Sequence, residues 1–191
     1  MEKQQTQDRI WYKLRGALIA PAYIFTFFCS YRESEHGLVF ALGLALFTLG
    51  LFLRIWSQMH LHYRLKEHKV LTMTGPYARV RNPIYMGNTL ILVGTTLIAE
   101  LMWFAPVMLL VCMLTYSLTV RYEERHLSEK YGEPYREFLT QVPRWVPRIQ
   151  TTPSAMAHNR LRFLLPSVGA ELHILLLLVL PLTKEVIFPH A

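Results

Sequence analysis

"NPIYMGNTLILVGTTLIAELMWFAPVMLLVCMLTYSLTV", residues 82–120, decides the fold of this chain. The stretch is about twice the length of roughly 20 apolar residues that a helix needs to cross a lipid bilayer. Its apolar character breaks near Glu100, where a charged residue stands among apolar ones. We therefore predict two membrane helices that are joined in a tight hairpin.

Three further apolar runs qualify as membrane helices. They are GALIAPAYIFTFFCSY from Gly16, GLVFALGLALFTLGLFLRIW from Gly37 and FLLPSVGAELHILLLLVLPL from Phe163. Hydrophobic residues make up 52% of the chain and charged residues only 17%, which is unusual for a soluble domain. The sequence therefore predicts an all-α integral membrane protein with about five transmembrane helices. We expect one membrane domain over residues 1–191, with two helices in 1–56, a core in 57–148, and a linker and last helix in 149–191.

The net charge of +7 could indicate nucleic-acid binding, but the placement of the basic residues favours a membrane topology. They gather beside the connection after the second predicted helix and again after the fourth: Arg54, Arg64, Lys66, Lys69, Arg79 and Arg81, then Arg121, Arg125, Lys130, Arg136, Arg144, Arg148, Arg160 and Arg162. Positive residues close to membrane helices stay on the cytoplasmic side. We therefore expect the N-terminus and both basic segments to face the cytoplasm, with no nucleic acid as a partner.

The polar segment after the fourth predicted helix reads RYEERHLSEKYGEPYREFLTQVPRWVPR from Arg121. Gly132 interrupts the helical pattern, and Pro134 stands where a new helix can start. That helix would carry an apolar stripe of Tyr135, Phe138, Leu139 and Val142. Two interpretations stay open: an amphipathic helix on the membrane surface that contacts lipid phosphates, or a cover over a site.

A second polar feature, GPYARVRNPIYMG at residues 75–87, comes just before the third predicted helix. Pro83 suits the first position of a helix, and a helix N-terminus attracts anions. Arg81 adds a planar, bidentate binder of carboxylate or phosphate, while Tyr77 and Tyr85 offer aromatic rings. The motif therefore favours an anionic ligand with a flat or cationic part. A basic anchor beside a proline-started helix is the simpler alternative.

Two further clusters contain ionisable residues at membrane depth or at its edge. Arg121, Glu123 and Glu124 end the fourth predicted helix, and Glu171 and His173 lie in the last one. Charges in such places are costly unless they are paired, so each cluster is a candidate site. The alternatives are a solvated helix end for the first cluster, and a contact with another helix or a second protomer for the second.

Two motifs together, TGPYARVRNPIYMG at 74–87 and EERHLSEKYGEPYREFLTQVPR at 123–144, resemble the isoprenylcysteine carboxyl methyltransferase family, which is related to phospholipid methyltransferases. The family pattern is a G-x-Y-x-x-x-R-H-P-x-Y stretch, a membrane hairpin, and E-E-x-x-L-x-x-x-[FY]-G-x-x-Y ending in V-P. The resemblance covers about residues 57–148. In that family the first motif binds S-adenosylmethionine, and the region of the glutamate pair faces the methyl acceptor.

The resemblance implies a set of cofactor-binding positions, and Arg81 joins this set because its guanidinium can bind a carboxylate. The set is His62, Lys69, Val70, Leu71, Thr72, Tyr77, Arg81, Asn82, Pro83, Ile84 and Tyr85. It also points to Glu124, Glu123 and Arg121 as residues on the catalytic side. Two positions depart from the family pattern. The family histidine before the proline is Asn82 here, and the family arginine falls on Val120 rather than on Arg121. One residue along a helix is a rotation of about 100°, so the role of Arg121 depends on where it faces.

We therefore predict an S-adenosylmethionine-dependent methyltransferase that acts on a hydrophobic, membrane-partitioned acceptor among membrane lipids. The resemblance favours an isoprenylcysteine-type carboxylate, with a phospholipid, an amine or a thiol as alternatives. It also implies the bacterial cytoplasmic membrane, with the active site facing the cytoplasm. An NADPH-dependent membrane reductase and a non-catalytic protein that binds anionic lipid stay open. His60, His62 and His68 lack metal-ligand spacing, so we predict no metal.

Overall fold

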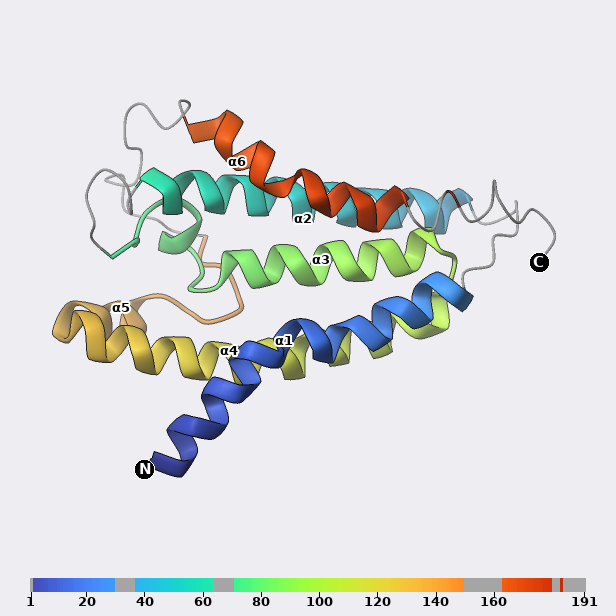
Figure 1. Ribbon diagram of the computed structural model, residues 1–191. Coiled ribbons are helices and arrows are strands. Elements are labelled where there is room, and N and C mark those ends of the chain that lie inside the picture. Colours follow the sequence, from blue (N-terminus) through green and yellow to red (C-terminus); the bar gives the residue numbers. More distant parts are fainter. Residues whose placement is uncertain (1, 30–36, 64–70, 150–162, 180–182, 184–191) are drawn as a thin grey trace.

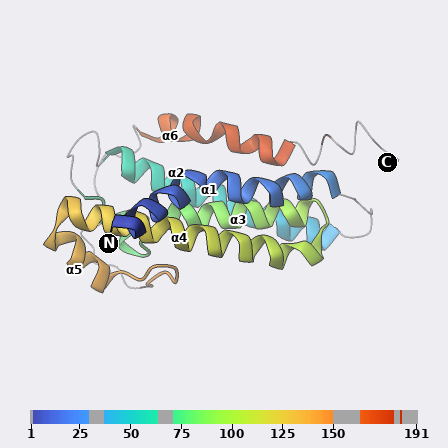
Figure 2. The same ribbon diagram turned by 60° about the horizontal axis from the view of Figure 1, so that its bottom comes forward.

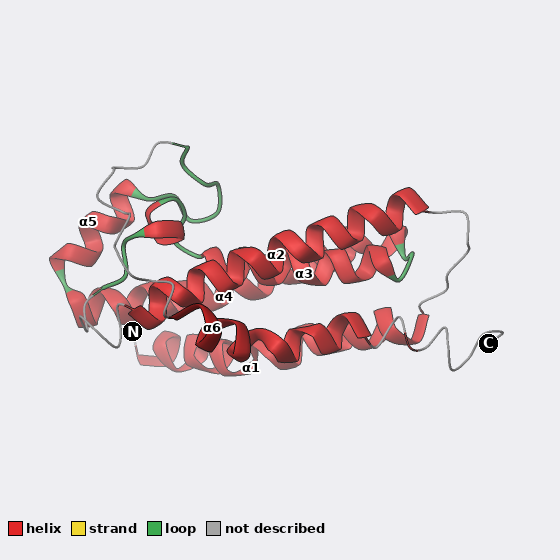
Figure 3. Ribbon diagram, turned by 90° about the horizontal axis from the view of Figure 1, so that it is seen from above, coloured by secondary structure: helices red, strands yellow, loops and turns green. Residues whose placement is uncertain are grey.

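The computed structural model describes residues 2–29, 37–63, 71–149, 163–179 and 183. Its α-helices are α1 (Glu2–Cys29), α2 (Gly37–Tyr63), α3 (Pro83–Ile98), α4 (Ala105–Tyr131), α5 (Glu133–Gln141) and α6 (Leu164–Glu171). Three short 3-10 helices accompany them: η2 (Gly75–Ala78), η3 (Met102–Phe104) and η6 (Leu172–Ile174). All regular structure in the described residues is helical (Figure 3). The predicted all-α class is therefore confirmed.

Two of the described helical stretches are long and apolar enough to cross a membrane, namely Gly37–His62 and Met102–Tyr131. Two shorter apolar helices, Pro83–Ile98 and Leu164–Val179, accompany them. The bundle exposes many large apolar side chains, such as Leu38, Phe52 and Leu114. The described structure therefore supports two candidate spans, and the expected total of five stays a prediction.

Helix α3 lies between α2 and α4, while α6 packs on α2 and α1 packs on α4 (Figure 1). The hydroxyl of Tyr23 in α1 donates a hydrogen bond to the backbone carbonyl of Leu177, at 3.1 Å. This contact joins α1 to the helical turn that follows η6. Figure 2 shows α6 and α5 on opposite sides of the bundle.

Glycines let the backbones of α2 and α3 touch. Gly43 and Gly50 in α2 are seven residues apart, and so are Gly87 and Gly94 in α3. A Cβ atom added to Gly50 would lie 2.7 Å from the carbonyl oxygen of Gly87, and one added to Gly94 would lie 2.7 Å from that of Gly43. Small residues at such spacing permit close helix packing. This contact sets which faces of α2 and α3 meet.

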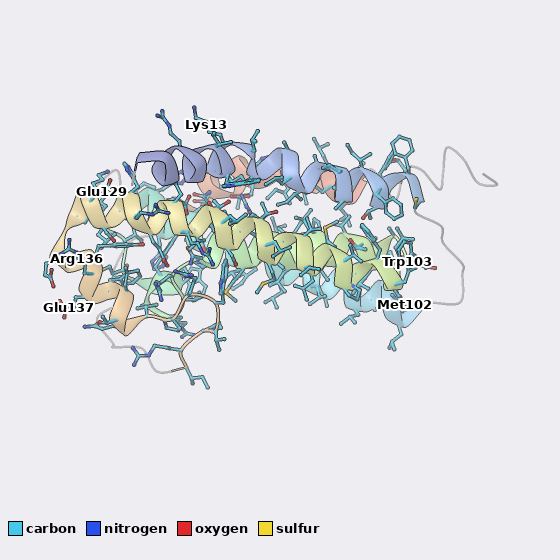
Figure 4. The ribbon with its side chains drawn as sticks, turned by 90° about the horizontal axis from the view of Figure 1, so that it is seen from below. Lys13, Met102, Trp103, Glu129, Arg136 and Glu137 are labelled. Carbon is cyan, nitrogen blue, oxygen red and sulfur yellow. The ribbon has the colours of Figure 1, made fainter. Side chains whose placement is uncertain are left out.

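The chain reverses between α3 and α4 over residues 99–104. Glu100 adopts φ 57°, a left-handed conformation that is uncommon for residues other than glycine. Met102 and Trp103 are exposed beside this turn. The charged side chains of Lys13, Glu129, Arg136 and Glu137 gather at the opposite end of the bundle (Figure 4). The two ends therefore differ in polarity.

Helix α5 turns back over the polar end of α4. Gly132 ends α4 and precedes α5 with φ 65°, and Pro134 lies in the first turn of α5. The interruption that the sequence predicts at Gly132 is therefore observed. Tyr135, Phe138 and Val142 are buried as one cluster, which packs on Leu71, Leu127, Tyr131 and Leu139. The apolar stripe of α5 is thus covered by protein side chains.

Candidate active site

The opening motif begins with a tight turn against α2. Gly75 has φ 65°, and a Cβ atom there would lie 1.8 Å from Cε1 of the buried His60 ring. Only glycine can adopt this backbone so close to a side chain. After η2, Pro83 starts α3 and is itself buried. The turn therefore carries residues 77–85 to the polar end of the bundle, where α4 and α5 meet.

The segment after α5 pairs with this motif through the backbone. The amide of Arg81 donates to the carbonyl of Pro143 at 3.0 Å, and the amide of Arg148 donates to the carbonyl of Arg79 at 2.8 Å. The side-chain amide of Asn82 reaches the carbonyl of Arg144 at 3.4 Å. These bonds bring the two motifs of the sequence together, although Asn82 and Arg144 are 62 residues apart.

Glu124 lies between two arginines at this junction. Nη1 of Arg81 donates to its Oε1 at 2.8 Å, and Nε of Arg144 donates to the same oxygen at 3.2 Å. Nη2 of Arg144 pairs with Oε2. Both carboxylate oxygens therefore accept bonds from guanidinium groups. Glu124 thus links the two motifs through its pairs with Arg81 and Arg144, and its predicted place on the catalytic side stays a prediction.

Glu123 faces α3 and accepts a hydrogen bond of 2.7 Å from the hydroxyl of Tyr85. The ring of Tyr85 stacks on that of Tyr116 in α4, with 4.8 Å between centroids and 29° between planes. Stacking restricts the Tyr85 ring, and the hydroxyl then orients the carboxylate. The adjacent glutamates thus have different hydrogen-bond partners, arginines for Glu124 and the Tyr85 phenol for Glu123.

A cavity of about 490 Å³ lies between α3, α4 and α5. Its walls contain Tyr12, Leu61, Leu71, Thr72, Tyr77, Arg81, Asn82, Pro83, Ile84, Tyr85, Tyr122, Glu123, Glu124, His126, Leu127, Lys130, Tyr131, Tyr135 and Phe138. Burial raises the pKa of the Tyr77 and Tyr135 phenols, with the charge of a nearby glutamate as a further cause for each. Both phenols are therefore neutral hydrogen-bonding groups near pH 7.

Most of the site residues predicted from the sequence line this cavity: Leu71, Thr72, Tyr77, Arg81, Asn82, Pro83, Ile84, Tyr85, Glu123 and Glu124. His62 does not, because its Nδ1 lies 3.3 Å from the Ser167 hydroxyl in α6 instead. Arg121 is exposed and points elsewhere, while its neighbour Val120 is fully buried. The helical rotation between adjacent residues explains that difference. Lys69 and Val70 lie outside the described residues.

Sequence reasoning missed several residues at or beside this cavity, among them Arg144, Tyr116 and Tyr12. Arg144 follows Glu124 by 20 residues, and the end of α4, Gly132 and the whole of α5 lie between them. Tyr116 reads as one more aromatic residue in an apolar helix. Tyr12 belongs to α1, far from both motifs in sequence. The available sequence signal for Arg144 was its position directly after Val142 and Pro143, which end the second motif.

A second, smaller cavity of about 200 Å³ adjoins Tyr116. Met86, Thr89 and Leu90 of α3, Cys112, Met113 and Tyr116 of α4, and Trp145 line it. Most of these side chains are apolar. Because Tyr116 stacks on Tyr85, an aromatic pair separates this apolar cavity from the polar one.

The described residues form a helical bundle with a cavity of charged and aromatic residues at one end and a smaller apolar cavity beside it. The chain belongs to the phospholipid methyltransferase family, which matches residues 38–134. The resemblance to isoprenylcysteine and phospholipid methyltransferases that the motifs predict is thus confirmed. Helices α1 and α6 lie outside the matched residues.

Individual relatives agree with this family. The chain is 30% identical over 108 residues to the cobalt-zinc-cadmium resistance protein CzcN of Cupriavidus metallidurans, covering 56% of this chain and 47% of that protein. It is 30% identical over 101 residues to methanethiol S-methyltransferase of Crocosphaera subtropica, covering 48% of this chain and 36% of that protein. It is 30% identical over 121 residues to protein-S-isoprenylcysteine O-methyltransferase B of Arabidopsis thaliana, covering 59% of this chain and 61% of that protein. The chain thus spans less than two thirds of each relative, and no solved structure matches it significantly.

Proposed function

We propose that this chain is a membrane methyltransferase that takes its methyl group from S-adenosylmethionine. One observation carries the proposal: ten of the site residues predicted from the sequence line a single cavity. Its volume of about 490 Å³ falls within the range of roughly 300–1,000 Å³ that is usual for small-molecule sites. Family membership favours a methyl transfer reaction for such a site.

The residues present fit the cofactor. Nε of Arg81 is buried and has no hydrogen-bond partner among the described residues, so it can donate to a carboxylate, although Glu124 already engages Nη1. Aromatic rings of Tyr77, Tyr85 and other lining tyrosines suit a flat base and a cationic centre. When bound, S-adenosylmethionine supplies an electrophilic methyl group on a sulfonium. Arg81 would hold its carboxylate, and the tyrosines would enclose the rest.

Glu123 and Tyr85 form the acceptor side of the proposed site. The Tyr85 hydroxyl holds the Glu123 carboxylate in one orientation. An amine or thiol acceptor must lose a proton, and Glu123 is the lining carboxylate that can accept it. A carboxylate acceptor needs no base, and Glu123 would then serve to orient it. Tyr135 and Phe138 of α5 line one side of the cavity, where their apolar packing would help to limit water.

The apolar cavity beside Tyr116 is the proposed place for the hydrophobic part of the acceptor. It lies between α3 and α4, where an apolar chain could reach it from the membrane. The family resemblance favours an isoprenylcysteine-type carboxylate, and phospholipid amines and small thiols are the alternatives. The relative from Arabidopsis thaliana is named for the first of these and that from Crocosphaera subtropica for a thiol.

We expect Met113→Trp to raise KM for an acceptor with an apolar chain, because the larger side chain fills the cavity beside Cys112 and Tyr116. Loss of a few buried methylene contacts, at about 0.8 kcal/mol each, corresponds to an increase of about tenfold or more. Acceptor saturation curves on purified protein measure it. Leu114→Trp is the matched control, because Leu114 is exposed one position further along α4. Equal KM values in both variants would place the acceptor elsewhere.

The proposed topology follows the polarity of the bundle. The site, α5 and many charged side chains occur at one end, which we assign to the cytoplasmic side of a bacterial cytoplasmic membrane. The turn between α3 and α4 would then face outward. Five spans in one membrane domain would be made by α1, α2, α3, α4 and the helical stretch from α6 onward.

Isothermal titration of detergent-purified protein tests the function. We expect saturable binding of S-adenosylhomocysteine, the demethylated product, and no binding of NADPH. Binding of NADPH alone would favour a membrane reductase. Binding of neither, with retained binding to anionic vesicles, would favour a non-catalytic lipid-binding protein. Either outcome contradicts the proposal.

A further inference from the structure

A buried ion pair joins α6 to α2. Nε of Arg54 donates to Oε2 of Glu171 at 2.7 Å, and Nη2 donates to Oε1 at 3.0 Å. The side chains are only 13% and 2% exposed. The contact is bidentate, which constrains the plane of the guanidinium group.

The third guanidinium nitrogen continues this contact toward the candidate active site. Nη1 of Arg54 donates to Oδ1 of Asn88 in α3. The Asn88 side chain also lies within interacting range of the hydroxyl of Tyr116 in α4. Tyr116 stacks on Tyr85, which donates to Glu123. A continuous series of contacts thus runs from α6 to the cavity.

Stability alone does not account for this pair. Replacing a buried ion pair with apolar residues of similar volume is often neutral or stabilising. Helix α6 also has other attachments, since Ser167 contacts His62 and Ile174 packs in a cluster with Phe47 of α2. The pair is therefore better explained by the orientation that it imposes on Asn88.

We infer that Glu171 is a positioning residue for the candidate active site. It holds the Arg54 guanidinium, which holds the Asn88 amide, and Asn88 places the Tyr116–Tyr85 stack that orients Glu123. The catalytic importance of that orientation rests on the proposed function, whereas the orientation itself does not. Glu171 lies outside the residues that the family matches, so the contact is a feature of this chain that family membership does not supply.

The central test is the double variant Arg54→Met with Glu171→Met. We expect a melting temperature close to that of the unmodified protein, because both charges are removed together. We expect turnover to fall about 100-fold with unchanged affinity for S-adenosylhomocysteine, as occurs when distant substitutions misplace reacting groups. An unchanged turnover would show that the pair is only a structural contact and would overturn the inference.

A second readout does not depend on activity. 3-Fluorotyrosine placed at position 85 reports the environment of that ring by 19F NMR, and we expect a shifted resonance in the double variant. Asn88→Leu should give a similar shift while keeping the Arg54–Glu171 pair intact. Glu133→Gln is the control, because its pair with Arg136 is exposed. An unchanged resonance in Asn88→Leu overturns the inference even where the double variant fails to fold.

The two proposals fail separately. Absence of S-adenosylhomocysteine binding, together with the expected resonance shifts, would remove the proposed function and leave the positioning role of Glu171 in place. Normal binding of S-adenosylhomocysteine with unshifted resonances in both variants would remove the positioning role of Glu171 and leave the proposed function in place.

Discussion

Replacement of Glu123 by glutamine is expected to lower turnover by about 10²–10⁴-fold with an amine or thiol acceptor, which is the usual contribution of a general base. The geometry supports this effect, because Glu123 lines the cavity and accepts a hydrogen bond from the neutral hydroxyl of Tyr85. Affinity for S-adenosylhomocysteine should stay unchanged. Tyr85→Phe keeps the stacked ring but removes that hydroxyl, so it should lower turnover by a smaller factor.

The pH profile distinguishes the classes of acceptor. A protonated carboxylic acid cannot accept a proton, so the rate of the unmodified protein should fall as the pH is lowered, and Glu123→Gln should lose this limb. With a carboxylate acceptor, no base is needed, so Glu123→Gln should not remove a fall in rate at low pH. Glu137→Gln is the control, since Glu137 lies on the exposed face of α5. Full turnover of Glu123→Gln at every pH would move the acceptor side away from Glu123.

Arg81→Ala is expected to weaken S-adenosylhomocysteine binding by about 10- to 100-fold, because a hydrogen bond to a charged group contributes about 1.5–3 kcal/mol. The variant should still fold. Arg144 continues to pair with Glu124, and the backbone bond from residue 81 to Pro143 does not need the side chain. Calorimetric titration measures the affinity, and a thermal melt measures folding.

Arg79→Ala is the matched control for this change, two residues earlier in the same turn. Its guanidinium is exposed and lies 5.8 Å from the centroid of the Trp56 ring, outside the cavity. Affinity should therefore be retained. If Arg81→Ala binds S-adenosylhomocysteine as tightly as Arg79→Ala does, the cofactor carboxylate has another partner.

Local signals in the sequence predicted much of the fold and of the cofactor side of the site. The break near Glu100, the interruption at Gly132 and the start of α3 at Pro83 all occur where the sequence places them. Each depends on the conformational preference of one or two residues, so neighbours in sequence suffice to reveal it. The two motifs likewise contain eight of the predicted site residues that line one cavity, and Leu71 and Thr72 just before the first motif add two more.

The direction that each side chain faces needed more than a motif. Arg121, Glu123 and Glu124 are near neighbours in sequence, yet Arg121 is exposed whereas both glutamates line the cavity. Successive residues on a helix differ by about 100°, and the packing of α4 against its neighbours decides which of them face inward. The family pattern places its arginine at Val120 rather than at Arg121, so the pattern alone does not show which way the Arg121 side chain faces.

The sequence by itself therefore determined the helical class, the main helix breaks and the motifs of the candidate site. Only the tertiary structure decided the partners of the charged groups: Arg144 with Glu124, and Arg54 with Glu171 and Asn88. Arg54 and Glu171 are 117 residues apart. Such pairs form where two helix faces meet, and here the glycine contacts between α2 and α3 help to set those faces. No local pattern encodes this, because the meeting of distant faces depends on packing over the whole bundle.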